Sequence, residues 1–332
     1  MDVPYIVLGI VIFLALAFDF INGFHDTANA IATTVSTRAL KPRVAILMAA
    51  LMNFLGAITF TGVAKKLGGS IANPAELQHG VYIVIAALIS AILWNLLTWW
   101  FGIPSSSSHT LIGSLAGAVI SAEGWDGINA GGFTSIIKWL ILSPLIAFSI
   151  GFCVMWILKL IFAKSSPHKV NKGFRYSQVA TAAIQSFSHG TNDAQKAMGI
   201  IVFALMAANV QETDNVPLWV KVSAALAMAL GTSIGGYKII KTMGTKIFKI
   251  EPINGFAADI TSATVILTAT AAHFPVSTTH VITSSILGVG SAKRFSSVKW
   301  GMAGKIVVSW IITIPISMVL AGVIFQIIKL FL

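Results

Sequence analysis

NGFHDTANAIATT, residues 22–34, places a carboxylate, carboxamides, an imidazole and threonines inside an apolar run that is long enough to cross a bilayer. Asp26 is the charged residue of this stretch. An ionisable group within a membrane span is costly, and its presence there indicates an ion, proton or substrate site. A second version, SHGTNDAQKAMG, occupies residues 188–199. The fold must therefore account for a polar membrane segment that occurs twice.

The composition is that of a helical membrane protein. Hydrophobic residues make up 56% of the 332 residues and charged residues only 10%, whereas a soluble domain carries about 25% charged residues. Long apolar runs recur from end to end, and they lack the alternating polarity of membrane β-strands. We therefore predict an all-α polytopic membrane protein that is embedded in a lipid bilayer.

The net charge of +11 is explained by the positive-inside rule, under which basic residues concentrate in cytoplasmic connections. We therefore predict no nucleic-acid partner. Acidic residues outside the apolar runs fall mostly in the other connections. The basic residues gather in four clusters, at residues 38–43, 159–175, 238–249 and 293–299.

Cys153 is the only cysteine, so the chain forms no internal disulfide and no cysteine metal cluster. The first apolar run has no basic segment before it and no clear cleavage site after it. We therefore expect it to be a retained membrane span and not a signal peptide. We also expect this span to break at the polar residues 19–26.

The order of motifs in the first half of the chain returns in the second half. Asp26 aligns with Asp193, and PSSSSHT at residues 104–110 aligns with PVSTTHV at residues 275–281. Such self-similarity indicates a structural repeat. We divide the chain into a first repeat, a basic cytoplasmic linker and a second repeat, at residues 1–162, 163–177 and 178–332.

The two repeats are predicted to have opposite orientations in the membrane. Each contains about five to six apolar segments, and an odd number of crossings per repeat inverts the second relative to the first. With the N-terminus outside, the basic clusters fall on the cytoplasmic side. Inverted repeats with broken or re-entrant helices at the membrane midplane are typical of secondary transporters.

The paired motifs PSSSSHT and PVSTTHV have the composition of helix N-termini that bind anions. Proline suits the first turn of a helix, and the hydroxyls that follow lie beside backbone N–H groups without an intrahelical partner. Free N–H groups, hydroxyls and the positive end of the helix dipole together favour an anion. Two copies related by the repeat are able to hold a tetrahedral oxyanion from both sides. The alternative is that these hydroxyls only cap their helices.

The carboxylates are better suited to cations than to an anionic substrate. Asp26 and Asp193, with the side-chain oxygens of Asn22 and Asn29, offer the hard oxygen ligands that Na⁺ prefers, by analogy with other hard cations. A bound cation would offset the charges of carboxylate and anion in a site of low dielectric constant. A protonated carboxylate, and therefore H⁺ coupling, remains an alternative. Asp259 is a candidate for an additional cation or proton site, and we expect it to correspond to Asn53.

The remaining polar groups of these motifs have weaker signals. Lys196 follows Asp193 by one helical turn, so the two are expected to pair. His109 and His280 close the two hydroxyl motifs and are expected to fix the structure of the turn. His25 and His189 flank the aspartates, but they are not spaced as a metal site.

The chain resembles the inorganic phosphate transporter (PiT) family over essentially its whole length. GFHDTAN and GTNDAQK resemble the family's paired signature, and PSSSSHT and PVSTTHV resemble its paired hydroxyl motifs. The chain is similar to the short prokaryotic members. It departs from the usual signature at His25 and Lys196, and it has Asn53 where animal relatives have a glutamate, which leaves the coupling ion open.

The resemblance implies a multi-pass protein of the prokaryotic plasma (inner) membrane that transports inorganic phosphate with Na⁺, or with H⁺. It implies no cofactor other than the coupling ion, and assembly into a homo-oligomer stays open. The residues that the resemblance assigns to phosphate are Ser105, Ser106, Ser107, Thr110, Asn192, Gln195, Ser277, Thr278 and Thr279.

Several other functions stay open at this point. The same architecture suits sulfate, or H⁺-coupled transport of phosphate or of a metal–phosphate complex, and a channel is a further non-enzymatic option. An intramembrane hydrolase would use Ser107 or Ser108 with His109 and Asp26. A catalytic site needs no mirror copy of its motif, so we predict a transporter and not an enzyme.

Overall fold

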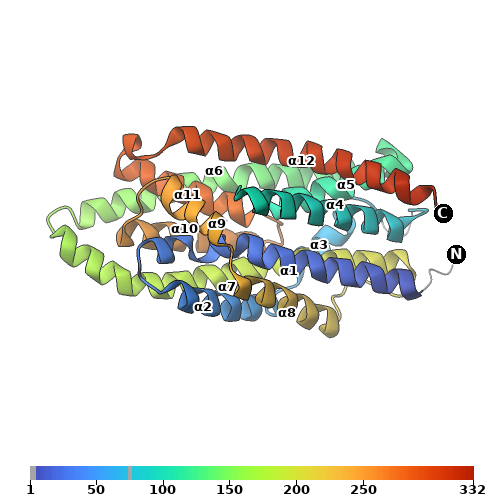
Figure 1. The fold of residues 1–332 in the computed structure, drawn as a ribbon, viewed down its shortest axis with the longest axis horizontal. Coiled ribbons are helices and arrows are strands. Elements are labelled where there is room, and N and C mark those ends of the chain that lie inside the picture. The colour runs from blue at the N-terminus through green and yellow to red at the C-terminus, as the bar shows by residue number, and fades with distance from the viewer. Residues whose placement is uncertain (1–4, 74–76) are drawn as a thin grey trace.

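The computed structural model describes residues 5–73 and 77–332, and within them two runs of six helices follow one another. In Figure 1 both termini lie at one end of the molecule, and the connection between the two runs lies at the other. The first run is α1 (Tyr5–Ser36), α2 (Pro42–Ala57), α3 (Gly62–Ser70), α4 (Gly80–Phe101), α5 (Ser107–Glu123) and α6 (Ala130–Ile161). The second run is α7 (Pro167–Ala207), α8 (Leu218–Ile234), α9 (Tyr237–Lys241), α10 (Pro252–Ala271), α11 (Thr278–Lys293) and α12 (Trp300–Lys329).

The two runs pack through equivalent contacts. α1 packs on α8 as α7 packs on α2, and α5 packs on α12 as α11 packs on α6. α4 also contacts α1 as α10 contacts α7. This pairing confirms the predicted fold of two inverted repeats. One expected correspondence is wrong, because Asp259 lies in α10, whose counterpart is α4, whereas Asn53 lies in α2.

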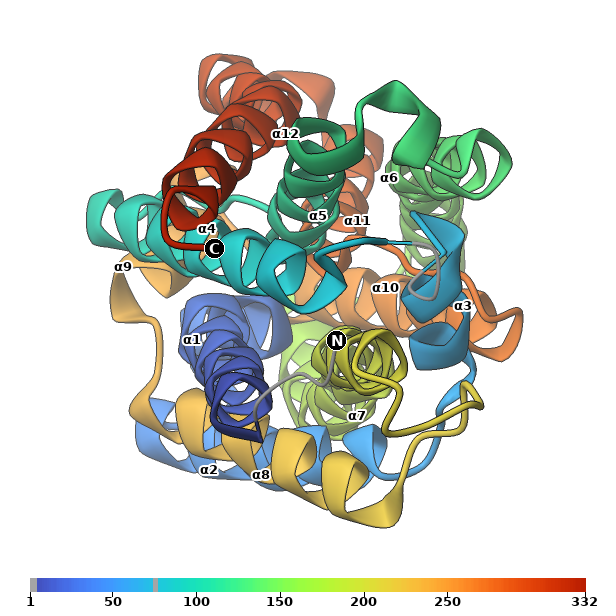
Figure 2. The same cartoon turned by 90° about the vertical axis from the view of Figure 1, so that its right-hand side faces the viewer.

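Viewed from the end that carries the termini, the helices form three layers (Figure 2). α1, α2, α7 and α8 form one outer layer, and α5, α6, α11 and α12 form the other. α4 and α10 lie between them. Both outer layers contain helices of both repeats, so the halves of the sequence are interleaved in space.

The orientation follows from the charges. The basic residues 159–175 lie in the end of α6, the start of α7 and the connection between them, opposite the termini (Figure 1). The positive-inside rule makes this the cytoplasmic end and the other the extracellular end. Four helices, α1, α4, α6 and α12, are long and apolar enough to cross a membrane, and α8 with its bent continuation through residue 246 makes a fifth.

One expectation about the long polar helices needs revision. The predicted break at residues 19–26 is wrong, because α1 is continuous through them. Neighbouring helices supply polar partners to His25 and Asp26, so the backbone does not have to open to satisfy them. Residues 167–177, which we assigned to the linker, form the first turns of α7.

The chain reverses direction near the middle of the long axis of the molecule, once between α4 and α5 and again between α10 and α11 (Figure 1). α4 and α5 therefore form a re-entrant hairpin that opens toward the extracellular end, and α10 and α11 form one that opens toward the cytoplasm. The residues that end α4 and α10 share a left-handed conformation, with φ of 64° at Gly102 and 61° at His273. Glycine adopts this conformation without steric cost, whereas histidine does not.

Short helices brace the two turns. Lys66 of α3 lies 3.5 Å above the ring of Phe274, next to the α10–α11 turn. In the equivalent place, Lys238 of α9 donates a hydrogen bond of 3.0 Å to the carbonyl of Trp100, next to the α4–α5 turn. The two turns are therefore held at the centre of the molecule by equivalent contacts.

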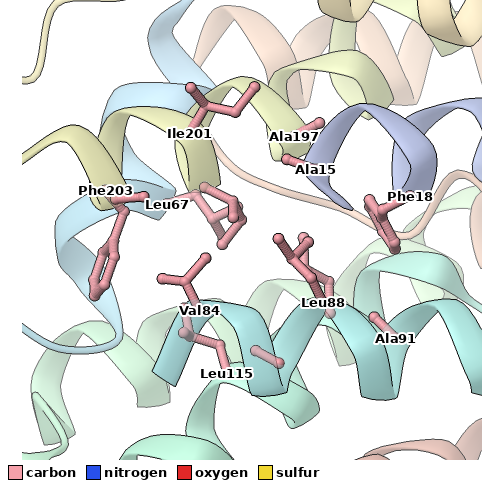
Figure 3. Packing of buried hydrophobic residues seen from close by; sticks show 14 of the residues in the cluster. Ala15, Phe18, Leu67, Val84, Leu88, Ala91, Leu115, Ala197, Ile201 and Phe203 are labelled. Carbon is pink, nitrogen blue, oxygen red and sulfur yellow. The ribbon is translucent and has the colours of Figure 1, made fainter. Parts of the chain in front are cut away.

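Apolar side chains fill the extracellular half of the interior (Figure 3). They come from α1, α3, α4, α5 and α7, and all are buried. We call them the outer apolar cluster. Its labelled members are Ala15, Phe18, Leu67, Val84, Leu88, Ala91, Leu115, Ala197, Ile201 and Phe203.

Candidate functional site

The polar stretches of α1 and α7 meet at the centre of the molecule. One side-chain ligand atom from each of Asp26, His189 and Asp193 lies within 4.8 Å of the other two, and all three residues are buried. His189 and Asp193 are four residues apart and therefore share a helix face, while Asp26 comes from the other repeat. The sequence interpretation missed this cluster because its third member lies on another helix. The i, i+4 spacing of His189 and Asp193 was the available signal.

The heads of α5 and α11 lie beside this cluster, and each begins with a capping serine. The Ser106 hydroxyl accepts a hydrogen bond of 3.1 Å from the backbone N–H of His109. The Ser277 hydroxyl accepts one of 3.2 Å from the backbone N–H of His280. Serine at this position satisfies a backbone donor that the helix leaves free. Capping, which was the alternative to anion binding, therefore accounts for these two serines.

The hydroxyls that follow the caps make different contacts. Ser107 donates to Oδ2 of Asp26 at 3.2 Å, and Thr278 donates to Oδ2 of Asp193 at 2.8 Å. The two pairs occupy equivalent places in the repeats. Thr279 adds a longer bond of 3.5 Å to Oδ1 of Asp26 and accepts one of 2.8 Å from Asn29. The helix heads thus carry hydroxyls that are aimed at the aspartates.

The residues before the two aspartates fasten the hairpin turns. Nε2 of His25 lies 3.2 Å from the hydroxyl of Thr98 and 3.4 Å from that of Ser105. Asn192, its counterpart, donates to the hydroxyl of Thr270 at 3.0 Å and accepts from the backbone N–H of Val276 at 3.4 Å. The predicted phosphate ligands Ser105 and Asn192 therefore have partners within the turns.

The predicted pairing of Lys196 with Asp193 is present as a buried ion pair. Nε2 of His189 lies 3.1 Å from the other carboxylate oxygen of Asp193. The Lys196 side chain is 1% exposed. Burial of a charge is costly unless an opposite charge compensates it. Lys196 therefore balances one of the negative charges at the centre.

The other predicted site residues lie at different places. Thr110 donates to the carbonyl of Ser106 within its own helix. The Gln195 side-chain oxygen accepts from the first backbone N–H groups of α3, at Val63 and Ala64, so it positions α3. Asp259 accepts a hydrogen bond of 2.7 Å from Thr33 and is buried on α10. Asn22 is buried, and among the described residues its side chain has no partner other than the neighbouring Asp19 carboxylate.

The residues predicted for a hydrolytic triad, Ser107 or Ser108 with His109 and Asp26, do not form one hydrogen-bonded chain. Nδ1 of His109 lies 2.9 Å from the capping hydroxyl of Ser106, whereas Ser108 donates to the carbonyl of Val276. The ring of His109 lies 4.2 Å from that of His280, which stacks on Trp310 at 3.8 Å between ring centroids. A triad requires the serine, histidine and carboxylate in one hydrogen-bonded chain. The histidines instead pack the two hairpin tips against each other.

The centre combines features for ions of both signs. Two helix N-termini and the hydroxyls of Ser107, Thr278 and Thr279 offer donors to an oxyanion. The carboxylates, a carboxamide and an imidazole offer ligands to a cation. Since oppositely charged ions attract strongly where water is excluded, this arrangement favours the joint binding of an anion and a cation.

Comparison with known proteins extends these observations. The chain matches the phosphate transporter family over residues 22–169 and 162–321. It is 57% identical over 331 residues to the probable low-affinity inorganic phosphate transporter of Bacillus subtilis (strain 168), covering 99% of each chain. It is 44% identical over 311 residues to a protein with the same description from Rhizobium meliloti (strain 1021), covering 93% of this chain and 92% of the relative.

One solved structure has a similar fold. It is described as the sodium-dependent phosphate transporter, and it superimposes with a TM-score of 0.86 at 27% sequence identity. The match covers 98% of this chain and 100% of the other. The similarity therefore includes both repeats and both hairpins.

Proposed function

This chain belongs to the phosphate transporter family, and from that premise we propose that it moves inorganic phosphate together with Na⁺ by alternating access. It is a multi-pass protein of the prokaryotic inner membrane. The observation that carries the proposal is the matched pair of contacts from Ser107 to Asp26 and from Thr278 to Asp193. Each contact joins a hydroxyl at a helix head to a carboxylate, so anion donors and cation ligands are adjacent in both repeats.

Phosphate would be held mainly by the helix heads. The hydroxyls of Ser107, Thr278 and Thr279 would turn from the carboxylates to the phosphate oxygens, because a hydroxyl donates one hydrogen bond at a time. The N-termini of α5 and α11 would add the positive ends of their helix dipoles. A carboxylate next to phosphate would accept a hydrogen bond from a P–OH group. Sulfate has no hydroxyl group to donate at neutral pH. This difference favours phosphate over sulfate.

The coupling ion would neutralise the aspartates. Asp26, Asn29 and Asp193 provide the oxygen ligands, and Lys196 competes with the ion for Asp193. The fold of the sodium-dependent relative supports Na⁺ as the coupling ion. Neither ion would be stable alone at this depth, so each would bind more tightly in the presence of the other.

Reconstituted protein tests this proposal. Labelled phosphate should enter proteoliposomes when an inward Na⁺ gradient is applied, and arsenate should compete more strongly than sulfate. Uptake that ignores Na⁺ but follows a pH gradient would replace Na⁺ with H⁺ in the proposal. Inhibition by sulfate without inhibition by arsenate would contradict the substrate.

A second candidate is H⁺-coupled transport of a divalent-metal–phosphate complex. The convergence of Asp26, His189 and Asp193 favours it, since two carboxylates and an imidazole suit a divalent transition metal better than Na⁺. In that case labelled Mn²⁺ should enter the liposomes together with phosphate, and chelation of divalent cations should stop phosphate uptake. Phosphate uptake that persists in the chelator would exclude this candidate.

A further inference from the structure

Asp19, Asn22 and Asn95 are three buried polar residues that the central site does not use. Each is 0% exposed. Neither oxygen of the carboxylate and no oxygen or nitrogen of the two carboxamides forms a hydrogen bond with a described residue outside this group, within which the Asn22 carboxamide interacts with the Asp19 carboxylate. Buried polar groups in proteins nearly always have hydrogen-bond partners. Three neighbouring side chains that all lack a partner outside their own group, within a membrane protein, therefore indicate a place that is built for a ligand.

The packing of α1 on α4 brings these residues together. The two helices run in the same direction (Figure 1), and the contact between His25 and Thr98 fixes their register. Three residues earlier on each helix stand Asn22 and Asn95, so these two lie at the same level. Asp19 lies one turn farther toward the extracellular end on the same face of α1. The outer apolar cluster begins beyond it, where Phe18 points toward the part of α4 that carries Leu88 (Figure 3).

The charges near this group favour a cation. Asp193 and Lys196 of α7 are the charged groups that act on Asp19. Among the described residues, the buried charges in this region are the carboxylates of Asp19, Asp26 and Asp193 and the ammonium of Lys196. When all three carboxylates are ionised and the histidines are neutral, one lysine leaves two negative charges without compensation. Two monovalent cations, one at the central site and one at Asp19, would balance them.

The ligand atoms define the kind of cation. A carboxylate and two carboxamide oxygens are hard ligands, which suit Na⁺ and exclude soft metals. A single carboxylate close to the Lys196 ammonium favours one positive charge over two. The carboxylate also excludes phosphate.

We propose that Asp19, Asn22 and Asn95 form an outer Na⁺ site, separate from the central site. Seven residues of α1 separate Asp19 from Asp26, which corresponds to about 10 Å along the helix. In this proposal Asn22 binds a cation together with Asp19 and Asn95, whereas the sequence had grouped Asn22 with Asp26. Its contribution to coupling rests on the proposed Na⁺–phosphate transport, but its occupancy by Na⁺ does not.

Na⁺ binding to the purified protein without phosphate tests the site directly. The bound ²²Na⁺ per chain and the Na⁺ concentration that half-saturates thermal stabilisation are measured, with choline replacing Na⁺ at constant ionic strength. Asp19→Asn and Asn95→Leu should each remove one bound Na⁺ or raise the half-saturating concentration by about tenfold, because each removes a direct ligand. Asn95→Asp, which keeps an oxygen ligand and adds a charge, should lower it.

Ser143→Ala is the matched control. It removes a buried hydroxyl on α6 that also lacks a partner among the described residues, and it should leave Na⁺ binding unchanged. Melting curves in choline establish that each variant folds. The outer site is disproved if Asp19→Asn and Asn95→Leu bind Na⁺ as Ser143→Ala does, or if the unmodified protein binds no Na⁺. If the unmodified protein binds Na⁺ but takes up no phosphate, the transport proposal is contradicted and the outer site is not.

Discussion

Lys196 is a buried lysine at the centre of the molecule, and its ammonium group pairs with the carboxylate of Asp193. The pair lies on one helix, three residues apart. It resembles a cation site that already contains a tethered cation. An incoming Na⁺ would therefore have to displace an ammonium group that cannot diffuse away, which makes the affinity for Na⁺ adjustable through this one side chain.

Removal of one partner of this pair should be more harmful than removal of both. Asp193→Asn leaves a buried ammonium unpaired, and loss of one partner of a buried ion pair costs about 3–5 kcal/mol. We expect a clear drop in the melting temperature of the detergent-solubilised protein. The double variant Asp193→Asn/Lys196→Met should regain most of the melting temperature but not phosphate uptake. Recovery of uptake in the double variant would show that Asp193 is structural only.

The two hydroxyls at the head of α11 should separate capping from binding. Ser277→Ala removes the cap and should lower the stability by about 1 kcal/mol, with little change in the KM for phosphate. Thr278→Val keeps the cap and removes the hydroxyl next to Asp193, so we expect the KM to rise about tenfold, the equivalent of one hydrogen bond to a charged group. Melting curves and uptake kinetics measure the two effects. An equal KM in both variants would contradict the assignment of Thr278 to phosphate.

At the scale of the helices, small residues set how closely the repeats approach each other. Gly117 of α5 lies against the backbone of α12 at Met318, and Gly288 of α11 lies against the backbone of α6 at Phe148. A Cβ atom at either glycine would collide with the partner helix. Helix interfaces in membranes are enriched in small residues, which let the backbones approach closely and pack well.

Gly117→Val should therefore destabilise the protein by about 1–3 kcal/mol, the usual cost of added volume in a packed interior. Gly304→Val is its control, since Gly304 lies on α12 and a Cβ there meets nothing within 4 Å. The melting temperature should fall in the first variant and stay close to that of the unmodified protein in the second. Equal shifts would mean that helix propensity, and not the contact, decides the effect.

The sequence predicted some of these elements better than others. The repeat, the helix heads and the pair of Asp193 with Lys196 were predictable, because each depends on residues that are close in sequence or that recur in order. Two other features depend on which helices become neighbours: the cluster that contains His189, and the placement of Asn22 beside Asn95. The spacing of residues along the chain does not contain that information. The predicted break in α1 failed for the same reason, since the hydroxyl groups that contact Asp26 come from α5 and α11.

At the scale of the whole molecule, the two repeats are alike in sequence order but unlike in shape. A cavity of about 380 Å³ lies behind the α4–α5 turn and is lined by Pro104, Lys246 and Lys305 among others. Its counterpart behind the α10–α11 turn is about 140 Å³ and is lined by Trp139, where Phe274 stacks on the indole. If each repeat adopted the conformation of the other, the larger cavity would lie behind the α10–α11 turn. The centre would then be reached from the opposite side of the membrane.

Such an exchange should move the outer layers relative to each other. In a Cys153→Ser background, spin labels at Leu218 of α8 and at Leu330, just after α12, report on the distance between the layers, because both residues are exposed near the extracellular end. Labels at Tyr5 of α1 and Leu218 report on one layer alone. Phosphate with Na⁺ should shift the first distance distribution and leave the second unchanged. Equal shifts in both pairs would contradict motion between the layers.

The outer apolar cluster gives this motion a thermal signature. Opening toward the extracellular side would separate Phe18 and Leu88 (Figure 3) and expose their surfaces to water. Hydration of apolar surface raises the heat capacity by about 0.45 cal/mol/K for each Å², and its unfavourable free energy diminishes on cooling. The outward-open population should therefore grow as the temperature falls, and an Arrhenius plot of phosphate uptake should be curved. The cluster that closes the centre to water thereby makes the balance between the two open states a function of temperature.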